Sequence, residues 1–308
     1  LSGTPLINRP IELWTTLNII NPSQFPSFWK FAHQYADAKP NKWGGWDFSG
    51  ASNIALLHEK LSKIMIRRRK EDILDQLPPK RRIILPLEME RRKDYDQAVN
   101  HFLDWLTKND PKKLRGALRA ERLVQLNYLK QLAAWSKMPS VLVWIDSFLR
   151  ETEEKIILFT VHKKIVERIY SNYKNISTVI DGSITGINRQ NNINQFLNNS
   201  RTRILIGNIK AAGVGWNAKG VSTAAFLELP WNPGSVSQAE DRLHGIGRGQ
   251  KGIPSTSYFL LAKNSIEEWL AKIIQRKAEI IDQILDGEQQ EDHLDIFNQL
   301  CFLLKRNN

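Results

Sequence analysis

The sequence predicts an α/β fold, in which a mostly parallel β-sheet is flanked by helices and preceded by a helical module. From residue 139 onward, short runs rich in β-branched residues alternate with segments that carry apolar residues at helical spacing. This alternation is typical of a parallel sheet that is covered by helices on both faces. The first half lacks the alternation, because Pro, Gly and clustered tryptophans interrupt its helical segments.

Five strands are expected in the second half, each a short apolar run with β-branched residues: 155–160, 176–180, 202–207, 222–229 and 255–262. The expected helices carry apolar residues three and four positions apart: 162–173, 188–198, 235–244 and 265–285. In such sheets, ligands bind beyond the carboxyl ends of the strands. The expected functional loops are therefore those after Thr160, Ile180, Gly207 and Leu229.

The first half contains one further expected strand, 81–89, which is followed by two long amphipathic helices, 92–106 and 114–135. QLPPKRR at 76–82 combines paired prolines with consecutive basic residues and is expected to join the two halves. The tryptophan-rich loop before it holds Trp43 and Trp46, which either stack on bases or pack an ordered loop. The adjacent pair of glycines favours packing.

Composition narrows the classes of partner. The 308 residues carry a formal net charge of +12, and 42% of them are hydrophobic, which favours two domains. Basic faces bind phosphates by releasing counterions, so a nucleic acid is the first expected partner and an anionic membrane surface the second. Cys301 is the single cysteine, so the chain has no internal disulfide framework. No apolar run approaches the roughly 18 residues of a membrane span, and without a signal peptide we expect a soluble, intracellular fragment of a longer protein.

The sequence contains no complete nucleotide site. A GxxxxGK[ST] loop, which would hold the phosphates of ATP, is absent, so an ATP site would be completed from elsewhere. NIKAAGVGWN at 208–217 follows an expected strand directly, and its small residues would let backbone amides approach a ligand. The alternative is an ordinary turn after a strand.

WNPGSVSQAEDRLH at 231–244 is the second nucleotide-site candidate. Pro233 would end the preceding strand, and Ser235 or Ser237 would cap the helix. Gln238 and Arg242 are four positions apart, so they share one helical face and could both point at a phosphate chain, with Arg242 as a charge-stabilising finger. The alternative is a solvated helix whose charges lie on the surface. The position of both candidates at the carboxyl ends of adjacent strands favours the nucleotide site.

Basic residues are the third feature of the sequence that indicates a functional site. Candidates for contacts with backbone phosphates are RRRK (67–70), KRR (80–82), Lys163, Lys164 and Lys210. The three single lysines lie in the expected functional loops and are therefore favoured. The alternative is a solvated charged face, with RRRK paired to Glu71 and Asp72. His162 is expected at a helix N-terminus rather than as a metal ligand, because no His/Cys cluster has ligand spacing.

Several motifs resemble those of one known family. They are LSGTPL (1–6), IMIRRRKEDILDQLPPKRR (64–82), ILFTVHKK (157–164), AAGVGWN (211–217), LELPWNPG (227–234) and QAEDRLHGIG (238–247). In order and spacing they resemble the Swi/Snf-type, helicase-like DNA-dependent ATPases over nearly the whole chain. YADAKPNKWGGWDFSGASN (35–53) together with LELPWNPGSVSQAEDRLH (227–244) is most similar to the HepA-related annealing-helicase branch, whose members rewind or remodel forked DNA.

The resemblance implies two RecA-like lobes of the P-loop NTPase type, of which this chain would hold the helicase C-terminal lobe. Residues 1–20 would end the first lobe and 21–79 would form a helical protrusion and linker. The second lobe would span 80–290 with a helical insertion at 91–137, and 291–308 would form a C-terminal helix. The helix around Ile266 to Leu285 would brace the two lobes.

The resemblance also implies roles for individual residues. Ser2, Gly3 and Thr4 would couple the lobes, with the last two at the ATP site together with Gly213, Gly215, Asn217, Gln238 and Arg242. Lys163, Lys164, Asn208, Lys210 and Trp231 would lie along the DNA backbone. ATP and Mg would be bound mainly by the missing first lobe. The expected protein is a monomer that binds double-stranded or forked DNA and no membrane, in the cytoplasm or nucleoid, or in the nucleus of a eukaryote.

Two positions depart from the family pattern. HGIGRGQ stands where HRIGQ is usual, so Gly245 replaces a second arginine finger, which can contribute about a thousandfold to turnover. Either Arg248 takes over this role, with Gly245, Gly247 and Gly249 letting the chain fold back, or the finger is lost and Arg248 is a surface residue. Ile209 stands where many relatives carry Thr or Ser, which puts a DNA-backbone contact there in doubt.

The expected function is that of the C-terminal half of an ATP-dependent double-stranded-DNA translocase, which steps as its lobes open and close around ATP. The isolated chain should not hydrolyse ATP. One alternative is a non-catalytic DNA-binding scaffold derived from a single motor lobe, and another is an RNA-directed helicase.

Overall fold

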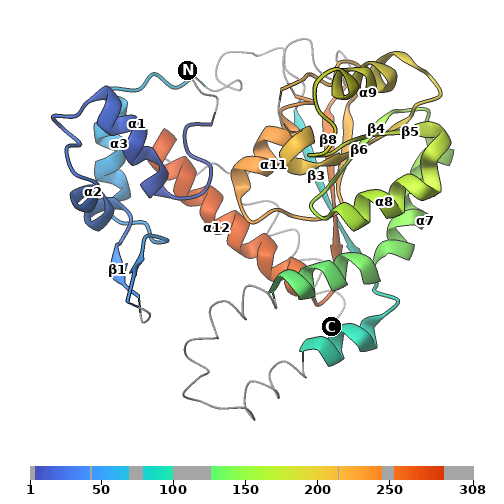
Figure 1. Ribbon diagram of the computed structural model, residues 1–308, viewed down its shortest axis with the longest axis horizontal. Coiled ribbons are helices and arrows are strands. Elements are labelled where there is room, and N and C mark those ends of the chain that lie inside the picture. The colour runs from blue at the N-terminus through green and yellow to red at the C-terminus, as the bar shows by residue number, and fades with distance from the viewer. Residues whose placement is uncertain are drawn as a thin grey trace.

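The computed structural model describes residues 4–41, 44–68, 79–99, 126–213, 215–244 and 253–287. A helical module lies on the left of Figure 1 and an α/β lobe on the right. The module consists of η1 (Pro10–Glu12), α1 (Leu13–Ile20), α2 (Phe28–Tyr35), α3 (Ile54–Ser62) and an antiparallel ribbon of β1 (Lys39–Pro40) and β2 (Trp46–Asp47).

The main sheet of the described chain has six strands in the order β3-β8-β7-β4-β6-β5, and every neighbouring pair is parallel. The strands are β3 (Lys80–Leu87), β4 (Ile156–Thr160), β5 (Ser177–Ile180), β6 (Ile204–Asn208), β7 (Thr223–Phe226) and β8 (Ser255–Ala262). All six were expected from the sequence, and β8 has the expected bounds. The predicted α/β class with a parallel sheet is confirmed.

Helices cover both faces of this sheet. They are α7 (Met138–Glu151), α8 (Lys163–Tyr173), η2 (Lys174–Ile176), α9 (Gly186–Asn198), α10 (Ile209–Ala212), α11 (Pro233–Glu240) and α12 (Ile266–Asp286). Strand residues point alternately to opposite faces. In β4, Ile156 and Leu158 pack in the core under α7 and α8, whereas Ile157 and Phe159 pack in the core under α9, α10 and α11.

Helix α12 connects the module with the lobe, as Figure 1 shows. Near its start, Leu270 and Ala271 pack in the core of the sheet. Near its end, Ile281, Ile284 and Leu285 pack in the core of the module, among residues of α1, α2 and α3. One continuous amphipathic helix therefore belongs to two hydrophobic cores.

Helix α11 starts two residues earlier than expected. Its N-cap is Asn232, whose Oδ1 accepts from Ser235 N at 2.9 Å, so capping by Ser235 or Ser237 was wrong. The physical reason is Pro233 at the first helical position, where its fixed φ suits the helix and its missing N–H costs nothing.

The expected helical insertion is helical over 92–99 and 126–136, and its residues 100–125 lie outside the described chain. Cys301 and the expected C-terminal helix also lie outside it. In the described part of the chain, no helix combines the length and the apolar character that crossing a membrane requires.

Candidate functional site

The loops after β4, β6 and β7 lie at one edge of the sheet, because these strands are adjacent and parallel. The β6 loop includes α10 and the glycines that follow it, and the β7 loop leads into α11. The two nucleotide-site candidates therefore lie at the same edge of the sheet, but the prediction that their strands are adjacent was wrong, because β4 lies between β6 and β7.

The N-terminal segment lies against α11. Gln238 Nε2 donates to Thr4 Oγ1 at 2.5 Å, and Gly234 N donates to Ile7 O at 3.3 Å. Lys277 of α12 adds bonds to Asn8 Oδ1 at 2.7 Å and to Trp231 O at 3.1 Å. Thr4, which was expected to couple the two lobes, therefore contacts one of the residues expected at the ATP site. Ser2 and Gly3 lie outside the described residues.

Arg242 joins α11 to the glycine-containing loop. Its Nε donates to Gln238 O at 3.1 Å and its Nη1 to Trp216 O at 2.8 Å. The Arg242 carbonyl in turn accepts from Ala218 N at 3.0 Å. The structure thereby brings Gln238 and Arg242 together with the loop that carries Gly213, Gly215 and Asn217.

Backbone geometry explains the two glycines of that loop. A Cβ at Gly213 would lie 2.5 Å from Ile209 O, and Gly215 has a φ of +76°. Asn217 is exposed.

Sequence reasoning missed Arg189 of α9, whose Nη2 donates to Ala211 O at 3.3 Å and whose guanidinium lies 3.7 Å from the Cβ position of Gly215. A lone arginine on a polar helix offers no sequence signal for this placement.

Glu240 at the end of α11 is not a surface charge, so the alternative of a solvated helix was wrong for this residue. Glu240 is buried and accepts from Arg82 through both oxygens, at 2.9 and 2.8 Å. Lys80 lies 3.6 Å from Asp241. The KRR run therefore ties β3 to α11, and at least two of its residues pair with carboxylates instead of standing free for DNA.

Arg67, from the RRRK run, donates to both carboxylate oxygens of Asp286 at the end of α12, with Nη2 to Oδ2 at 3.0 Å. The fold thus brings a carboxylate from α12 to the first residue of the RRRK run. Glu71 and Asp72 lie outside the described residues.

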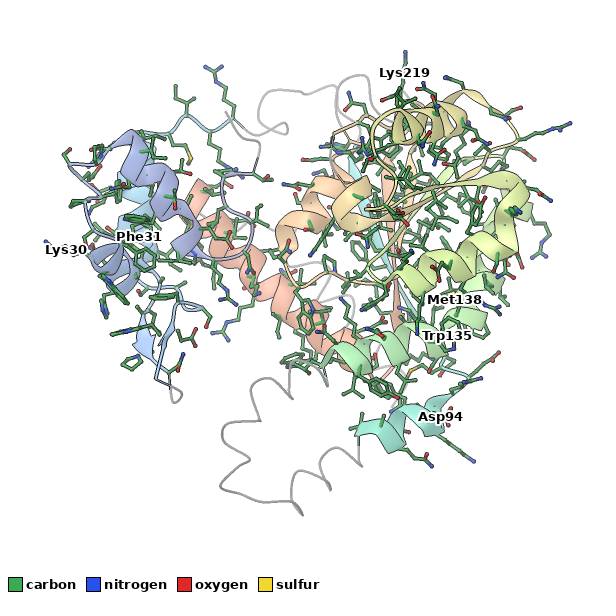
Figure 2. All side chains as sticks on the ribbon, viewed as in Figure 1. Lys30, Phe31, Asp94, Trp135, Met138 and Lys219 are labelled. Atoms are coloured by element: carbon green, nitrogen blue, oxygen red, sulfur yellow. The ribbon has the colours of Figure 1, made fainter. Side chains whose placement is uncertain are left out.

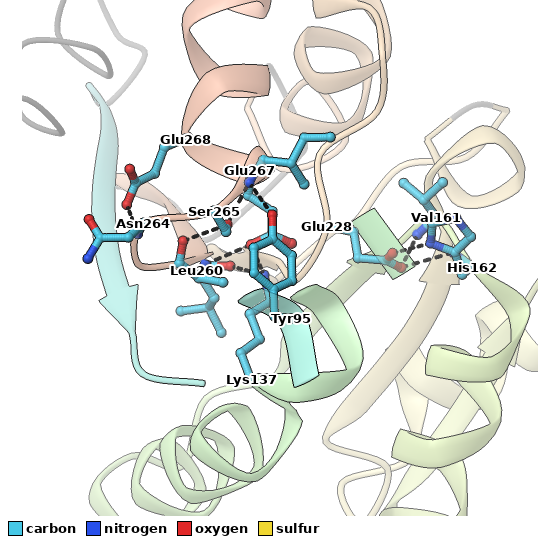
Figure 3. A network of polar contacts seen from close by, with 12 residues as sticks. Tyr95, Lys137, Val161, His162, Glu228, Leu260, Asn264, Ser265, Glu267 and Glu268 are labelled. Carbon is cyan, nitrogen blue, oxygen red and sulfur yellow. Dashed lines mark hydrogen bonds and ion pairs between the residues drawn. The ribbon is translucent and has the colours of Figure 1, made fainter. Parts of the chain in front are cut away.

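Glu228 organises the loop after β4. This buried carboxylate accepts from Val161 N at 2.8 Å, from His162 N at 2.9 Å and from His162 Nδ1 (Figure 3). Burial alone would raise the pKa of Glu228, but these hydrogen bonds outweigh it and hold the pKa below its ordinary value. His162 is the N-cap of α8, as predicted, and Lys163 and Lys164 stand exposed in its first turn.

The other expected DNA contacts differ in exposure. Lys210 is exposed, whereas Asn208 is half-buried and its side chain is engaged, since Oδ1 accepts from Lys210 N at 3.1 Å and Nδ2 donates to Val161 O at 2.7 Å. Trp231 is half-buried, and Ile209 packs in the core. The exposed cations at this edge include Lys163, Lys164 and Lys210.

Lys130 also reaches this edge and was missed by sequence reasoning. Its side chain is buried, and its ammonium lies 5.3 Å from the centroid of the Trp231 ring. Burial lowers the pKa of Lys130 to about 8. Helical spacing places it on the apolar side of helix 126–136 with Ala133 and Ala134, which was the available signal.

The module tryptophans form a separate aromatic group. The Trp46 ring lies 5.1 Å from Trp29 and 5.0 Å from His33, so it packs on α2 as the favoured interpretation predicted. Trp43 lies outside the described residues, as do Gly245, Gly247, Arg248 and Gly249.

Comparison with known families identifies the chain. The SNF2-related domain matches residues 1–140, and the helicase conserved C-terminal domain matches residues 137–247. The chain belongs to the SNF2-related family. The two matched regions overlap at residues 137–140.

Curated relatives of this SNF2-related chain include two named proteins. One is the SWI/SNF-related matrix-associated actin-dependent regulator of chromatin subfamily A-like protein 1 of Xenopus tropicalis, 33% identical over 92% of this chain and 30% of the relative. Another is the DNA annealing helicase and endonuclease ZRANB3 of Homo sapiens, 32% identical over 94% of this chain and 27% of the relative. The chain thus spans less than a third of either relative.

The fold agrees with a solved SNF2 structure. The Sulfolobus solfataricus SWI2/SNF2 ATPase core in complex with dsDNA has a TM-score of 0.53 and 21% identity, and the match covers 90% of this chain and 60% of that one. The predicted RecA-like class is therefore confirmed for the SNF2-related chain.

The donor groups at α11 fit a phosphate chain. Thr4 offers a hydroxyl, Gln238 an amide and Arg242 a guanidinium, next to a loop of small residues. These groups suit phosphate oxygens. No carboxylate belongs to this set, so a magnesium ion would be held by other groups. Within the described residues, no cluster of His, Cys, Asp or Glu has the makings of a metal site.

Proposed function

We propose that the chain supplies the second RecA-like lobe of an ATP-dependent double-stranded-DNA translocase of the annealing-helicase type. The observation that supports this most is the hydrogen bond between Thr4 and Gln238. It joins the segment expected to couple the lobes to α11, and the proposed finger, Arg242, lies in the turn directly after that helix. The domain boundaries inferred from the sequence are part of the proposal.

In this proposal, ATP with its magnesium ion, bound mainly by a first lobe, supplies the phosphoryl group that is transferred to water. Arg242 stabilises the charge that develops on the γ-phosphate, and Gln238 orients that phosphate. The loop from Gly213 to Asn217 transmits the state of the site towards DNA. The hydrogen bond from Arg242 Nη1 to Trp216 O supports this role, because a movement of the guanidinium would displace the loop directly.

DNA is bound along the carboxyl edge of the sheet in this proposal. Lys163, Lys164 and Lys210 contact backbone phosphates, which fits their exposure and the net charge of +12. Asn208 and Glu228 hold the loops that carry these lysines, since both bond to the backbone of residues 161–162. Because the Trp231 side chain is half-buried, Trp231 would contact DNA in this proposal mainly through its backbone.

DNA-stimulated ATP hydrolysis by a protein that joins this chain to its first lobe tests the proposal. We expect Arg242→Ala to lower turnover by about a thousandfold or more, because a finger contributes about that factor. The matched control is Arg168→Ala, on the exposed face of α8, which should leave turnover unchanged. The 308 residues alone should show no turnover.

Normal turnover of Arg242→Ala, or hydrolysis by a clean preparation of the chain alone, would contradict the proposal. In the same assay Arg248→Ala and Gly245→Arg decide between the two interpretations of HGIGRGQ. A harmless Arg248→Ala rules out a relocated finger.

A further inference from the structure

Helix 126–136 presents two aromatic side chains to solvent. Tyr128 is 57% exposed and Trp135 is 40% exposed, whereas Leu129, Ala133 and Ala134 on the other side are buried. The two aromatic residues are two helical turns apart, about 10 Å along the axis. Trp135 is labelled at the edge of the lobe in Figure 2. Large exposed aromatic surfaces of this kind mark binding sites more often than scattered apolar residues do.

A groove lies between this helix and the start of α8. Tyr128, Leu132 and Trp135 line one side, and His162, Lys163 and Lys164 line the other. Its volume of about 480 Å³ falls within the range of ligand sites, about 300 to 1,000 Å³. The groove thus combines an aromatic wall with a cationic rim.

The charges around the groove define the kind of ligand. Among the described residues that line it, none is acidic, and Lys163, whose side chain is 70% exposed, lies 3.9 Å from Glu167 one turn further along α8. The first turn of α8 also directs backbone N–H groups towards the rim. Aromatic faces stack on bases and cations bind the connecting phosphates, which is the combination that unpaired nucleic acid recognises. Paired DNA cannot use it, because its base faces are already stacked on one another.

We propose that this groove binds unpaired nucleotides of single-stranded DNA, with bases stacked on Tyr128 and Trp135 and phosphates at Lys163 and Lys164. The site rests on the proposed function, since it would place an unpaired strand beside the edge that binds duplex. An apolar peptide is the competing occupant. Two exposed lysines beside an aromatic wall favour the nucleic acid.

Equilibrium binding of the full chain to a fluorescent oligothymidine and to a duplex of equal length, at one salt concentration, tests the site. Tyr128→Ala with Trp135→Ala should weaken single-strand binding at least about tenfold, since stacking on each aromatic ring contributes measurably to affinity. Duplex binding should change less than about twofold by the same reasoning. Tyr128→Phe with Trp135→Phe keeps an aromatic ring at both positions and should bind like the wild type.

Trp29→Ala is the positional control, because Trp29 is 47% exposed on α2, at the other end of the molecule in Figure 1. Photo-crosslinking of the wild-type chain to an iodouracil-containing single strand should label Tyr128 or Trp135, and it does not depend on the folding of a variant. Unchanged single-strand affinity in the alanine variant, or crosslinks only elsewhere, overturns the proposal. Equal loss for strand and duplex also overturns it. Failure of the translocase proposal would appear instead as normal turnover of Arg242→Ala.

Discussion

At the scale of single residues, Lys130 and Lys137 show two ways of burying an ammonium group. Lys137 Nζ donates to Leu260 O at 2.5 Å and to Glu267 Oε2 at 2.6 Å, which also accepts from Ala262 N (Figure 3). Lys130 Nζ, among the described residues, has the Trp231 ring as its neighbour and no hydrogen-bond partner. Replacing one partner of a buried ion pair destabilises the folded protein, whereas a buried charge without a partner itself lowers the stability.

We therefore predict that Lys130→Met stabilises the protein at pH 7. The folded-state pKa of about 8 lies below the ordinary 10.5, so the burial penalty is complete below pH 8 and disappears as pH rises to 10.5. The advantage of the variant should be up to about 3 kcal/mol at pH 7 and should vanish near pH 10.5. Urea unfolding of both proteins at several pH values measures it.

Lys219→Met, at an exposed position labelled in Figure 2, is the control and should show no such pH dependence. A Lys130→Met variant that is less stable at pH 7 would mean that the contact with Trp231 outweighs the desolvation penalty.

At the scale of elements, α11 is the point where distant segments meet. Its start packs on the N-terminal segment, its middle bonds to Thr4, and its end pairs with Arg82 of β3. Gly234 permits the first of these contacts, because a Cβ there would lie 2.9 Å from Ile7 Cγ2 and 3.0 Å from Ile7 O. Residues 4–8 can therefore lie this close to α11 only because residue 234 is a glycine and has no side chain.

Gly234→Ala should displace this segment and lower the free energy of unfolding by about 1–3 kcal/mol, the usual cost of overpacking. Amide hydrogen exchange should increase at residues 4–8 more than in the sheet. Gly182→Ala is the matched control, since nothing lies within 4 Å of its Cβ position. Equal exchange in the two variants would show that the segment does not depend on this contact.

At the scale of the whole molecule, α12 holds the helical module and the lobe together. Ile284 is fully buried in the module core, and its carbonyl lies 3.1 Å from His58 Nδ1 of α3. Arg67 closes the same end of the helix through Asp286. Loss of packing at the end of α12 should therefore uncouple the module.

Ile284→Ala should cost about 2–5 kcal/mol, the range for truncating a buried Ile. Ile187→Ala, 79% exposed on α9, removes the same atoms and should stay within about 0.5 kcal/mol of the wild type. Denaturant unfolding followed by tryptophan fluorescence compares them. A similar loss in both variants would contradict the role given to α12.

The helix expected at 235–244 ends at Glu240, so Arg242 does not share a helical face with Gln238. The sequence by itself determined the strands and most helices. Each of these follows from local periodicity, which specifies which residues lie on the same side of one element. The order of motifs along the chain likewise indicated the family that the comparisons confirm.

Only the tertiary structure decided which faces meet. Thr4 and Gln238 are 234 positions apart, and Arg82 and Glu240 are 158 apart, so no local pattern connects them. Arg67 and Asp286 are 219 positions apart, so the same reason applies to their pair. Periodicity identifies a face, but the partner that covers it is selected by the packing of distant segments.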